Sequence, residues 1–332
     1  MLRNVRSRLE SWPLASPFRI SRGVKTVAEV VTVEIAEGGA LGRGEAVPYA
    51  RYGETPDSVL AQLLAVEQAL ADGLDRAELS RLLPPGAARN AADCALWDLE
   101  AQLSGRTVAE AVCGGRLRPL ITALTVSLDQ PERMGEAAAP LAGARLIKVK
   151  VDAGEPEACL RAVREKVPDA AMIVDPNESW DLRLLERLQP VLSELRTTFI
   201  EQPLPAGEDG CLDGLGRLVP ICADESCHTA ADLDVLERRY DMVNVKLDKT
   251  GGLTEAVTLI EAARGRGLGV MVGCMISSSL SIAPAFHIAA LADHADLDGP
   301  LWLKEDRAGG VAMHEGLLVP PQPGFWGARE ER

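Results

Sequence analysis

The chain has 332 residues, of which 47% are apolar, 25% are charged and only 4% are aromatic, and its formal net charge is −14. This composition is typical of a globular protein that is long enough for one barrel-sized domain and a smaller one. The negative charge and the lack of a long basic run exclude a nucleic-acid-binding protein and disfavour an anionic membrane surface as a partner.

The first residues alternate charged and apolar side chains and lack the continuous apolar stretch of a signal peptide. The seven cysteines are odd in number and irregularly spaced, which favours reduced thiols. A stretch without charged residues lies between Gly267 and Asp293, but its serines and its proline predict a buried strand and helix rather than a membrane span. We therefore expect a cytoplasmic protein.

Residues 1–117 are predicted to form an α+β capping domain, which the C-terminal segment 303–332 completes. A hairpin turning at Gly38 and Gly39 is expected, and residues 55–73 and 87–105 have helical patterns. The loops at 17–26 and 48–55 combine glycine, arginine and turn residues. We expect both loops to lie over the mouth of the second domain.

Residues 118–302 are predicted to form a (β/α)7β barrel, an α/β fold with parallel strands inside and helices outside. Short β-branched runs recur about every 25 residues, one per βα unit, and segments such as 157–167 and 253–267 between them have helical spacing. No long amphipathic helix follows the last run, so seven outer helices are expected. The eight predicted strands lie within residues 120–128, 145–151, 171–177, 197–203, 220–226, 242–248, 269–275 and 295–301.

Three carboxylates stand at the ends of three consecutive predicted strands: Asp175, Glu201 and Asp224. The carboxyl ends of barrel strands build the active site, and oxygen ligands that converge there suit a hard divalent ion such as Mg²⁺. Taken singly, each carboxylate could instead cap a loop. Three in succession favour a metal site.

Lys148 and Lys150 are two residues apart on one strand and therefore share a face, which we expect to be the barrel interior. Lys246 occupies the matching place on the sixth strand, nearly across the barrel. Two lysines that face each other over a metal suit removal of a proton from a carbon next to a carboxylate, with return of a proton on the opposite face. Repulsion from Lys148 would lower the pKa of Lys150 toward that of a base. Alternatively, the lysines are only counterions of the carboxylates.

The chain resembles the enolase superfamily, its muconate-lactonising subgroup, and within that subgroup the dipeptide epimerases that act on L-Ala-D/L-Glu. The resemblance covers nearly the whole chain and matches the known pattern of a lysine base with Mg²⁺. Its motifs are "KVK", "DPNES", "EQP", "CADES", "NVKLDKTGGLTEA" and "ADLDGPLW", with "PYARYGE" and "GAARNAADCALWDLEA" in the first domain.

The resemblance implies that Lys150 and Lys246 are the two acid/base catalysts and that Lys148 contacts the substrate carboxylate and tunes Lys150. It implies that one Mg²⁺ per subunit is bound by Asp175, Glu201 and Asp224.

The resemblance also assigns the substrate pocket. Asp296 and Asp298 would hold the free ammonium group of a dipeptide, which makes physical sense because two neighbouring carboxylates repel each other unless a cation lies between them. The alternative for Asp298 is a loop cap. Arg22 would hold the side-chain carboxylate of the substrate, with Arg19 and Arg51 as competitors. Four further residues would line the peptide pocket: Thr125, Cys274, Met275 and Ile276.

The activity that the resemblance implies is epimerisation between L-Ala-D-Glu and L-Ala-L-Glu through an enediolate, in the recycling of murein peptides. Two alternatives stay open at this point: an o-succinylbenzoate synthase or cycloisomerase, whose substrates have no ammonium group for Asp296 and Asp298, and an inactive scaffold. The sequence does not reveal the full range of dipeptides that are accepted or the physiological pathway. It also does not reveal the oligomeric state, that is, whether the protein is a homo-oligomer.

Overall fold

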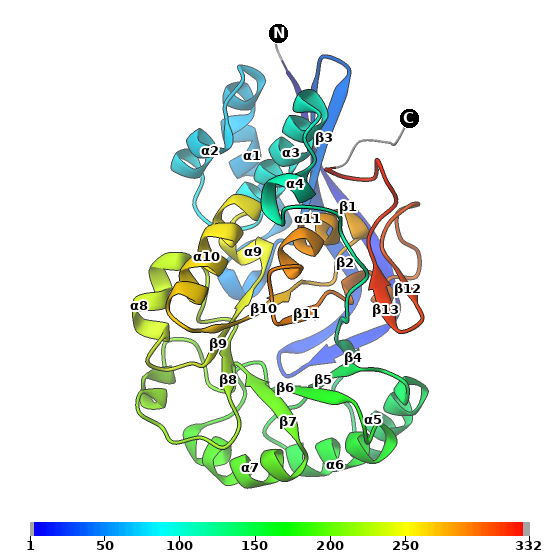
Figure 1. The fold of residues 1–332 in the computed structure, drawn as a ribbon, viewed down its shortest axis with the longest axis vertical. Coiled ribbons are helices and arrows are strands. Elements are labelled where there is room, and N and C mark those ends of the chain that lie inside the picture. Colours follow the sequence, from blue (N-terminus) through cyan, green and yellow to red (C-terminus); the bar gives the residue numbers. More distant parts are fainter. Residues whose placement is uncertain (1–2, 328–332) are drawn as a thin grey trace.

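The computed structural model describes residues 3–327 (Figure 1). Its N-terminal part is an antiparallel sheet of three strands in the order β1-β2-β3, covered by helices. The strands are β1 (Asn4–Ile20), β2 (Gly23–Glu37) and β3 (Ala40–Ala46), and the helices are α1 (Pro56–Ala71), α2 (Arg76–Leu82), α3 (Ala87–Ser104) and α4 (Val108–Val112).

Local sequence explains how α1 and α3 are placed. Thr55 caps α1 with a reciprocal hydrogen-bonded capping box to Ser58, and Pro56 is the first helical residue, as expected. Helix α3 lies directly on β3, because a Cβ atom at Gly42 or Gly44 would come within 2.1 Å or 2.0 Å of a backbone oxygen of α3. The two glycines therefore allow the strand and the helix to pack backbone against backbone.

The predicted loop at 17–26 is the tip of a long hairpin instead. Strands β1 and β2 pair out to Ile20 and Gly23, with a register shift between Pro13 and Phe18. The predicted loop at 48–55 contains a short 3-10 helix, Ala50–Tyr52. Both segments line the cavity at the barrel mouth, where we expected them.

The second part is a sheet of eight parallel strands in consecutive order, which confirms the predicted barrel strands. The backbone N–H of Ala123 donates to the carbonyl of Ala295 at 2.8 Å, so the first and last strands also meet. The strands are β4 (Leu124–Val126), β5 (Leu146–Lys150), β6 (Ala171–Asp175), β7 (Thr197–Glu201), β8 (Ile221–Ala223), β9 (Met242–Val245), β10 (Gly269–Gly273) and β11 (His294–Asp296).

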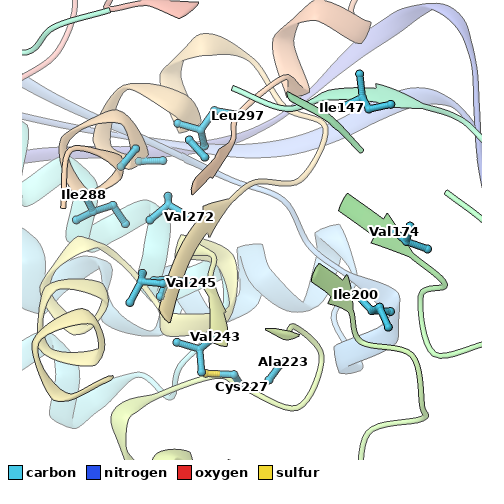
Figure 2. Packing of buried hydrophobic residues seen from close by; sticks show 14 of the residues in the cluster. Ile147, Val174, Ile200, Ala223, Cys227, Val243, Val245, Val272, Ile288 and Leu297 are labelled. Carbon is cyan, nitrogen blue, oxygen red and sulfur yellow. The ribbon is translucent and has the colours of Figure 1, made fainter. Parts of the chain in front are cut away.

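Helices surround these strands, and an apolar layer lies between them (Figure 2). Ile147 and Val149 of β5 belong to this layer, so the alternate residues Lys148 and Lys150 face the barrel interior, as predicted. The helices are α5 (Pro131–Ala138), α6 (Pro156–Lys166), α7 (Leu182–Glu194), α8 (Leu233–Leu236), α9 (Leu247–Thr250), α10 (Leu253–Gly265) and α11 (Ser279–Ala289).

The connection from β7 to β8 differs from the regular unit. It contains no α-helix, only the 3-10 turn Asp209–Leu212. Residues 203–220 carry four glycines and three prolines, which oppose a helix there. The connection after β8 is also short, with the 3-10 turn Ala230–Asp232 and the single-turn helix α8.

The chain after β11 returns to the N-terminal sheet. The 3-10 turn Gly299–Trp302 leads to an extended bridge between Leu303 and Leu14 of β1. A small hairpin follows, formed by β12 (Ala312–His314) and β13 (Leu317–Val319). Leu318 of this hairpin exchanges two backbone hydrogen bonds of 2.9 Å with Leu120. This last segment therefore contacts both parts of the fold.

Within the described residues, no helix is sufficiently long and apolar to cross a membrane. The uncharged stretch between Gly267 and Asp293 forms β10 and α11 instead, as the sequence predicted. The seven cysteines are all free thiols.

A pH dependence of stability follows from His287 in α11. The ring is buried, with Nδ1 2.8 Å from the carbonyl oxygen of Ala283, and burial lowers its pKa to about 4. The unfolded chain protonates this residue near pH 6.5, so the stabilisation is fully present above that pH and is lost as the pH falls toward 4. Between pH 7 and pH 4.5, we expect the unfolding free energy of a His287→Phe variant to fall by about 2 kcal/mol less than that of the wild type.

Urea denaturation at the two pH values measures this difference. The exposed His314 provides the control, because its replacement by phenylalanine should leave the pH dependence unchanged. Equal pH dependence in the wild type and the His287 variant would contradict the prediction.

Candidate active site

A cavity of about 490 Å³ lies at the carboxyl ends of the barrel strands, under the two segments of the N-terminal part. The barrel supplies strand ends and the loops that follow them, and the N-terminal part supplies the hairpin tip and the 50–52 turn. Among the predicted site residues, those that line the cavity are Arg22, Arg51, Thr125, Lys148, Lys150, Asp224, Lys246, Cys274, Met275, Ile276, Asp296 and Asp298.

The three predicted lysines point into this cavity from opposite sides of the barrel. Lys150 pairs in register with Asp175 on β6, and Nζ of Lys150 lies 2.5 Å from Oδ2 of Asp175. Lys246 follows β9 directly, and its Nζ lies 2.6 Å from Oδ2 of Asp224. Strands β5 and β9 are four positions apart in the eight-stranded order. The two lysines therefore approach one cavity from opposite walls.

Lys148 is almost completely buried among three carboxylates. Its Nζ lies 2.7 Å from Glu201, 2.7 Å from Asp296 and 3.0 Å from Asp175. Asp175 and Glu201 are the last residues of β6 and β7, and Asp224 follows β8. The predicted acidic residues thus come from neighbouring strands, as expected.

In residues 3–327, no three carboxylate, histidine or cysteine side chains surround a single point as metal ligands. The ammonium groups of the lysines lie between the carboxylates instead. One observation nevertheless fits a hard divalent cation: the three acidic groups are buried oxygen donors, and oxygen donors are the ligands that such an ion prefers.

Burial and neighbouring charges shift the pKa values of the acidic group in opposite directions. Burial, followed by repulsion from Asp175, raises the pKa of Glu201. Burial alone would also raise the pKa of Asp175, but Lys150 and Lys148 outweigh burial and lower it. Burial disfavours the charged form of Lys246 as well, yet Asp224 raises its pKa. Asp224 thus favours the ammonium form of Lys246, and a cation bound beside Asp224 would weaken this effect.

The two aspartates of the last strand have different partners. Asp296 ends β11 and pairs with Lys148 through Oδ2, while its Oδ1 accepts no hydrogen bond. Oδ2 of Asp298 accepts from the backbone N–H of Thr125 at 2.8 Å and from Nε1 of Trp302 at 3.4 Å. Burial, then the charge of Asp296, raises the pKa of Asp298. A cation between the two would relieve this repulsion.

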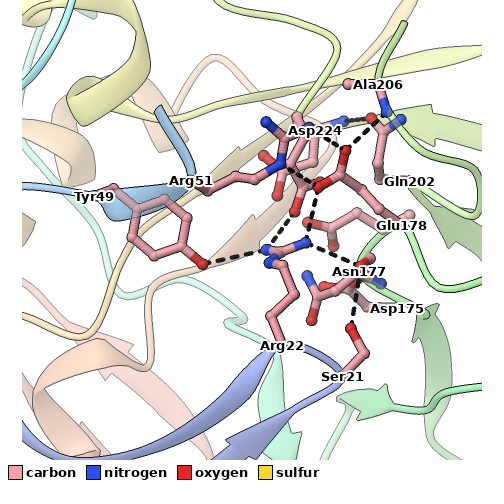
Figure 3. A network of polar contacts seen from close by, with 12 residues as sticks. Ser21, Arg22, Tyr49, Arg51, Asp175, Asn177, Glu178, Gln202, Ala206 and Asp224 are labelled. Atoms are coloured by element: carbon pink, nitrogen blue, oxygen red, sulfur yellow. Dashed lines mark hydrogen bonds and ion pairs between the residues drawn. The ribbon is translucent and has the colours of Figure 1, made fainter. Parts of the chain in front are cut away.

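The three candidate arginines have different surroundings, and Figure 3 shows those of Arg22 and Arg51. The guanidinium of Arg22 lies 2.7 Å from Glu225 and 3.0 Å from Glu178, and it also donates to the carbonyl of Asn177 and to the hydroxyl of Tyr49.

Arg51 donates two hydrogen bonds to Glu178, from Nε and from Nη2. Each nitrogen lies 2.7 Å from a carboxylate oxygen of Glu178. Arg19 is exposed and does not line the cavity. Arg22 and Arg51 therefore lie at the cavity, and Arg19 does not.

Sequence reasoning missed three buried side chains that hold the acidic group. Nζ of Lys249 lies 2.7 Å from Oδ1 of Asp224, and Nδ2 of Asn244 donates to Oε1 of Glu201 at 2.8 Å. Oε1 of Gln202 accepts from the backbone N–H of Asp224. Asn244 is two residues before Lys246, so the same alternation that placed the lysines could have identified it.

Comparison with known proteins identifies the family of the chain. Residues 133–325 match the family "Enolase C-terminal domain-like", and residues 2–112 match "Mandelate racemase / muconate lactonizing enzyme, N-terminal domain". The chain is 47% identical over 307 residues to L-Ala-D/L-Glu epimerase of Escherichia coli, which covers 92% of this chain and 96% of that protein.

Two solved structures are similar to this chain over nearly its whole length. An enolase family member from Agrobacterium tumefaciens with homology to dipeptide epimerases, with bound sodium and L-Ala-L-Glu, has a TM-score of 0.96 and 47% identity, over 98% of this chain and 100% of that chain. Dipeptide epimerase from Methylococcus capsulatus, in complex with Mg and L-Arg-D-Lys, has a TM-score of 0.90 and 34% identity, over 98% and 99% of the two chains.

The buried Lys249 gives a test of the charge balance. A Lys249→Met variant leaves Asp224 with one ammonium partner fewer in a buried site, so we expect a loss of about 3 kcal/mol in the unfolding free energy. Lys166, an exposed lysine paired only with Glu165, is the matched control, and its replacement by methionine should change stability by less than about 0.5 kcal/mol. Urea denaturation of both variants compares the losses, and similar losses would refute the role of Lys249.

Proposed function

Because the chain belongs to the mandelate racemase/muconate-lactonising family of the enolase superfamily, we propose that it is a dipeptide epimerase that interconverts L-Ala-D-Glu and L-Ala-L-Glu. One observation carries the proposal: Lys150 and Lys246 approach one cavity from opposite walls, with acidic residues between them. The relatives that are named as epimerases or racemases support an isomerase and do not support the lyase alternative.

In the proposed reaction, the neutral amine of one lysine accepts the proton from the α-carbon of the second residue. The ammonium group of the other lysine then donates a proton to the opposite face of that carbon, which inverts it. Each lysine thus serves as base for one stereoisomer and as acid for the other. Lys148 would bind the carboxylate of the substrate and hold the α-carbon between the two walls.

Asp175, Glu201 and Asp224 would hold one Mg²⁺. When bound, the ion supplies positive charge that stabilises the negative charge that develops on the substrate carboxylate as the proton leaves. The same charge would offset that of Asp224, which keeps the pKa of Lys246 high.

Asp296 and Asp298 would bind the free ammonium group of the first residue of the dipeptide. Both are buried, and the unpartnered Oδ1 of Asp296 is available as an acceptor. Lys148 compensates the charge of Asp296 alone, so a substrate without a cationic group would leave Asp298 uncompensated, which is a second argument against a cycloisomerase. L-Ala-D-Glu is a fragment of murein, so the proposed place of the reaction is the breakdown of murein peptides.

Isotope exchange in heavy water tests the proposal. The wild type should incorporate deuterium at the α-carbon of glutamate from either L-Ala-D-Glu or L-Ala-L-Glu. A Lys150→Ala variant and a Lys246→Ala variant should each lose epimerisation by more than about 100-fold and retain exchange with only one stereoisomer, opposite in the two variants. Mass spectrometry and chiral analysis measure both products.

A Lys166→Ala variant should behave as the wild type, since this lysine is exposed and far from the cavity. Exchange of both stereoisomers in each active-site variant would rule out the two-lysine mechanism.

The metal site has a test that does not depend on activity. We expect Mg²⁺ to raise the melting temperature of the metal-free protein, because it binds the folded state and offsets the repulsion among buried carboxylates. A Glu201→Gln variant should lose most of this shift, and a variant at the exposed Glu194 should retain it. An unchanged shift in the Glu201 variant would contradict the assigned ligands.

A further inference from the structure

Gln202 follows Glu201 at the end of β7 and is hydrogen-bonded to the loop after β8. Its Oε1 accepts from the backbone N–H groups of Asp224 and Ser226, at 2.9 Å and 3.1 Å. Gln202 is completely buried, and its backbone is left-handed, with φ of 37°. Its amide oxygen therefore fixes the backbone from which the carboxylate of Asp224 extends.

The NH2 group of the Gln202 amide faces the opposite way. Its Nε2 lies 2.9 Å from Oγ of Ser226, 3.0 Å from the hydroxyl oxygen of Tyr240 and 2.9 Å from the carbonyl oxygen of Leu204. The oxygen and the nitrogen of an amide have nearly the same size, so shape alone does not decide which way the amide faces. The decision depends on whether the neighbouring groups donate or accept protons.

Asp209 settles the direction for the two hydroxyl groups. Its Oδ2 accepts from the hydroxyl of Tyr240 at 2.6 Å and from that of Ser226 at 2.7 Å. The two hydroxyl oxygens are also 3.3 Å apart, but a charged acceptor is the stronger partner. Each hydroxyl has one proton, so both present only lone pairs to Gln202. Burial, followed by the hydrogen bond to Asp209, raises the pKa of Tyr240, so this hydroxyl keeps the proton that it donates.

The carboxylate of Asp209 is itself held in place. Asp209 is 1% exposed, and its Oδ1 lies 2.8 Å from Nη1 of Arg239, which balances its charge. It begins the 3-10 turn Asp209–Leu212 in the connection between β7 and β8, which has no α-helix. This irregular connection therefore places a buried carboxylate one hydroxyl group away from the amide of Gln202.

Reversal of the amide would disturb the acidic group of the cavity. If Oε1 and Nε2 of Gln202 changed places, the NH2 group would face the backbone N–H groups of Asp224 and Ser226. Buried donors would then face one another without an acceptor, which is costly, and the backbone of Asp224 would have to move. The carboxylate of Asp224 would move with it, away from Lys246 and Lys249, whose Nζ atoms lie 2.6 Å and 2.7 Å from it.

We propose that Asp209 is a positioning residue for Asp224, one of the three residues assigned to Mg²⁺. Through two hydroxyl groups, Asp209 fixes the direction of the Gln202 amide, and that amide holds the backbone of Asp224. The inference rests on the metal site of the proposed function and deepens it. Asp209 does not line the cavity, so its effect reaches the ion only through these hydrogen bonds. Replacement of such supporting partners typically lowers metal affinity by about 10- to 100-fold.

Calorimetric titration of the metal-free protein with Mg²⁺ tests this inference without the use of activity. An Asp209→Asn variant keeps the shape of the side chain. Its amide oxygen would face Arg239, and its NH2 group would donate to both hydroxyls, which then turn their protons toward Gln202. We expect the dissociation constant for Mg²⁺ to rise by at least about tenfold. A Tyr240→Phe variant removes one hydroxyl and keeps the ring, and its constant should rise by about three- to tenfold.

Asp241→Asn is the matched control. Asp241 also accepts from an arginine, Arg217 at 2.8 Å, and from the backbone N–H of Ile221. Ile221 begins β8, whereas Asp224 follows the end of that strand, so Asp241 lies at the other end of the barrel. Its replacement should change the affinity for Mg²⁺ by less than about twofold.

A double-mutant cycle identifies the route of the effect. In a Gln202→Met background there is no amide to orient, so Asp209→Asn should change the affinity by less than about twofold. An effect of Asp209→Asn that persisted in full in that background would overturn the inference. Lower melting temperatures with unchanged affinity in both Asp209→Asn and Tyr240→Phe would also overturn it, because they would show a purely structural role. If the wild type bound no Mg²⁺, the proposed metal site itself would fail, and this inference with it.

Discussion

The structure depends on charge balance among buried groups at one end of the barrel. Lys148 has almost no exposed surface, and three carboxylates surround its ammonium group. A buried ion without a partner costs several kcal/mol, so neither the lysines nor the acids could occupy these positions alone. Each strand end must therefore bring its charge to the same place, and a closed barrel is the architecture that does so.

The strand pattern predicted much of this arrangement, because alternation and strand ends are local properties of the sequence. Lys148 and Lys150 face inward since Ile147 and Val149 face the helices, and that could be read from spacing alone. The pairing of Lys148 with Asp296 joins residues 148 positions apart and requires closure of the barrel, which spacing cannot show. The buried Lys249 was missed because its place in a short helix gives no periodic signal.

The arginines show a second limit of sequence reasoning. Arg22 has the residue type and the loop expected for a carboxylate ligand, yet its partners Asn177 and Glu178 are held in left-handed backbone, with φ of 47° and 68°. Such conformations are uncommon for residues other than glycine and are not visible in a single sequence. These conformations accompany the placement of Glu178 between Arg22 and Arg51. Both guanidinium groups are therefore already ion-paired to a carboxylate of the protein.

The return of the chain end to the first strand has a consequence for biosynthesis. The backbone N–H of Lys304 donates to the carbonyl of Pro13, and Nη2 of Arg307 lies 2.8 Å from the fully buried carboxylate of Glu45. Glu45 is translated 262 residues before Arg307. Its partners Ser278 and Arg307 both belong to later segments, so the N-terminal sheet cannot form this buried contact during translation until those segments have been synthesised.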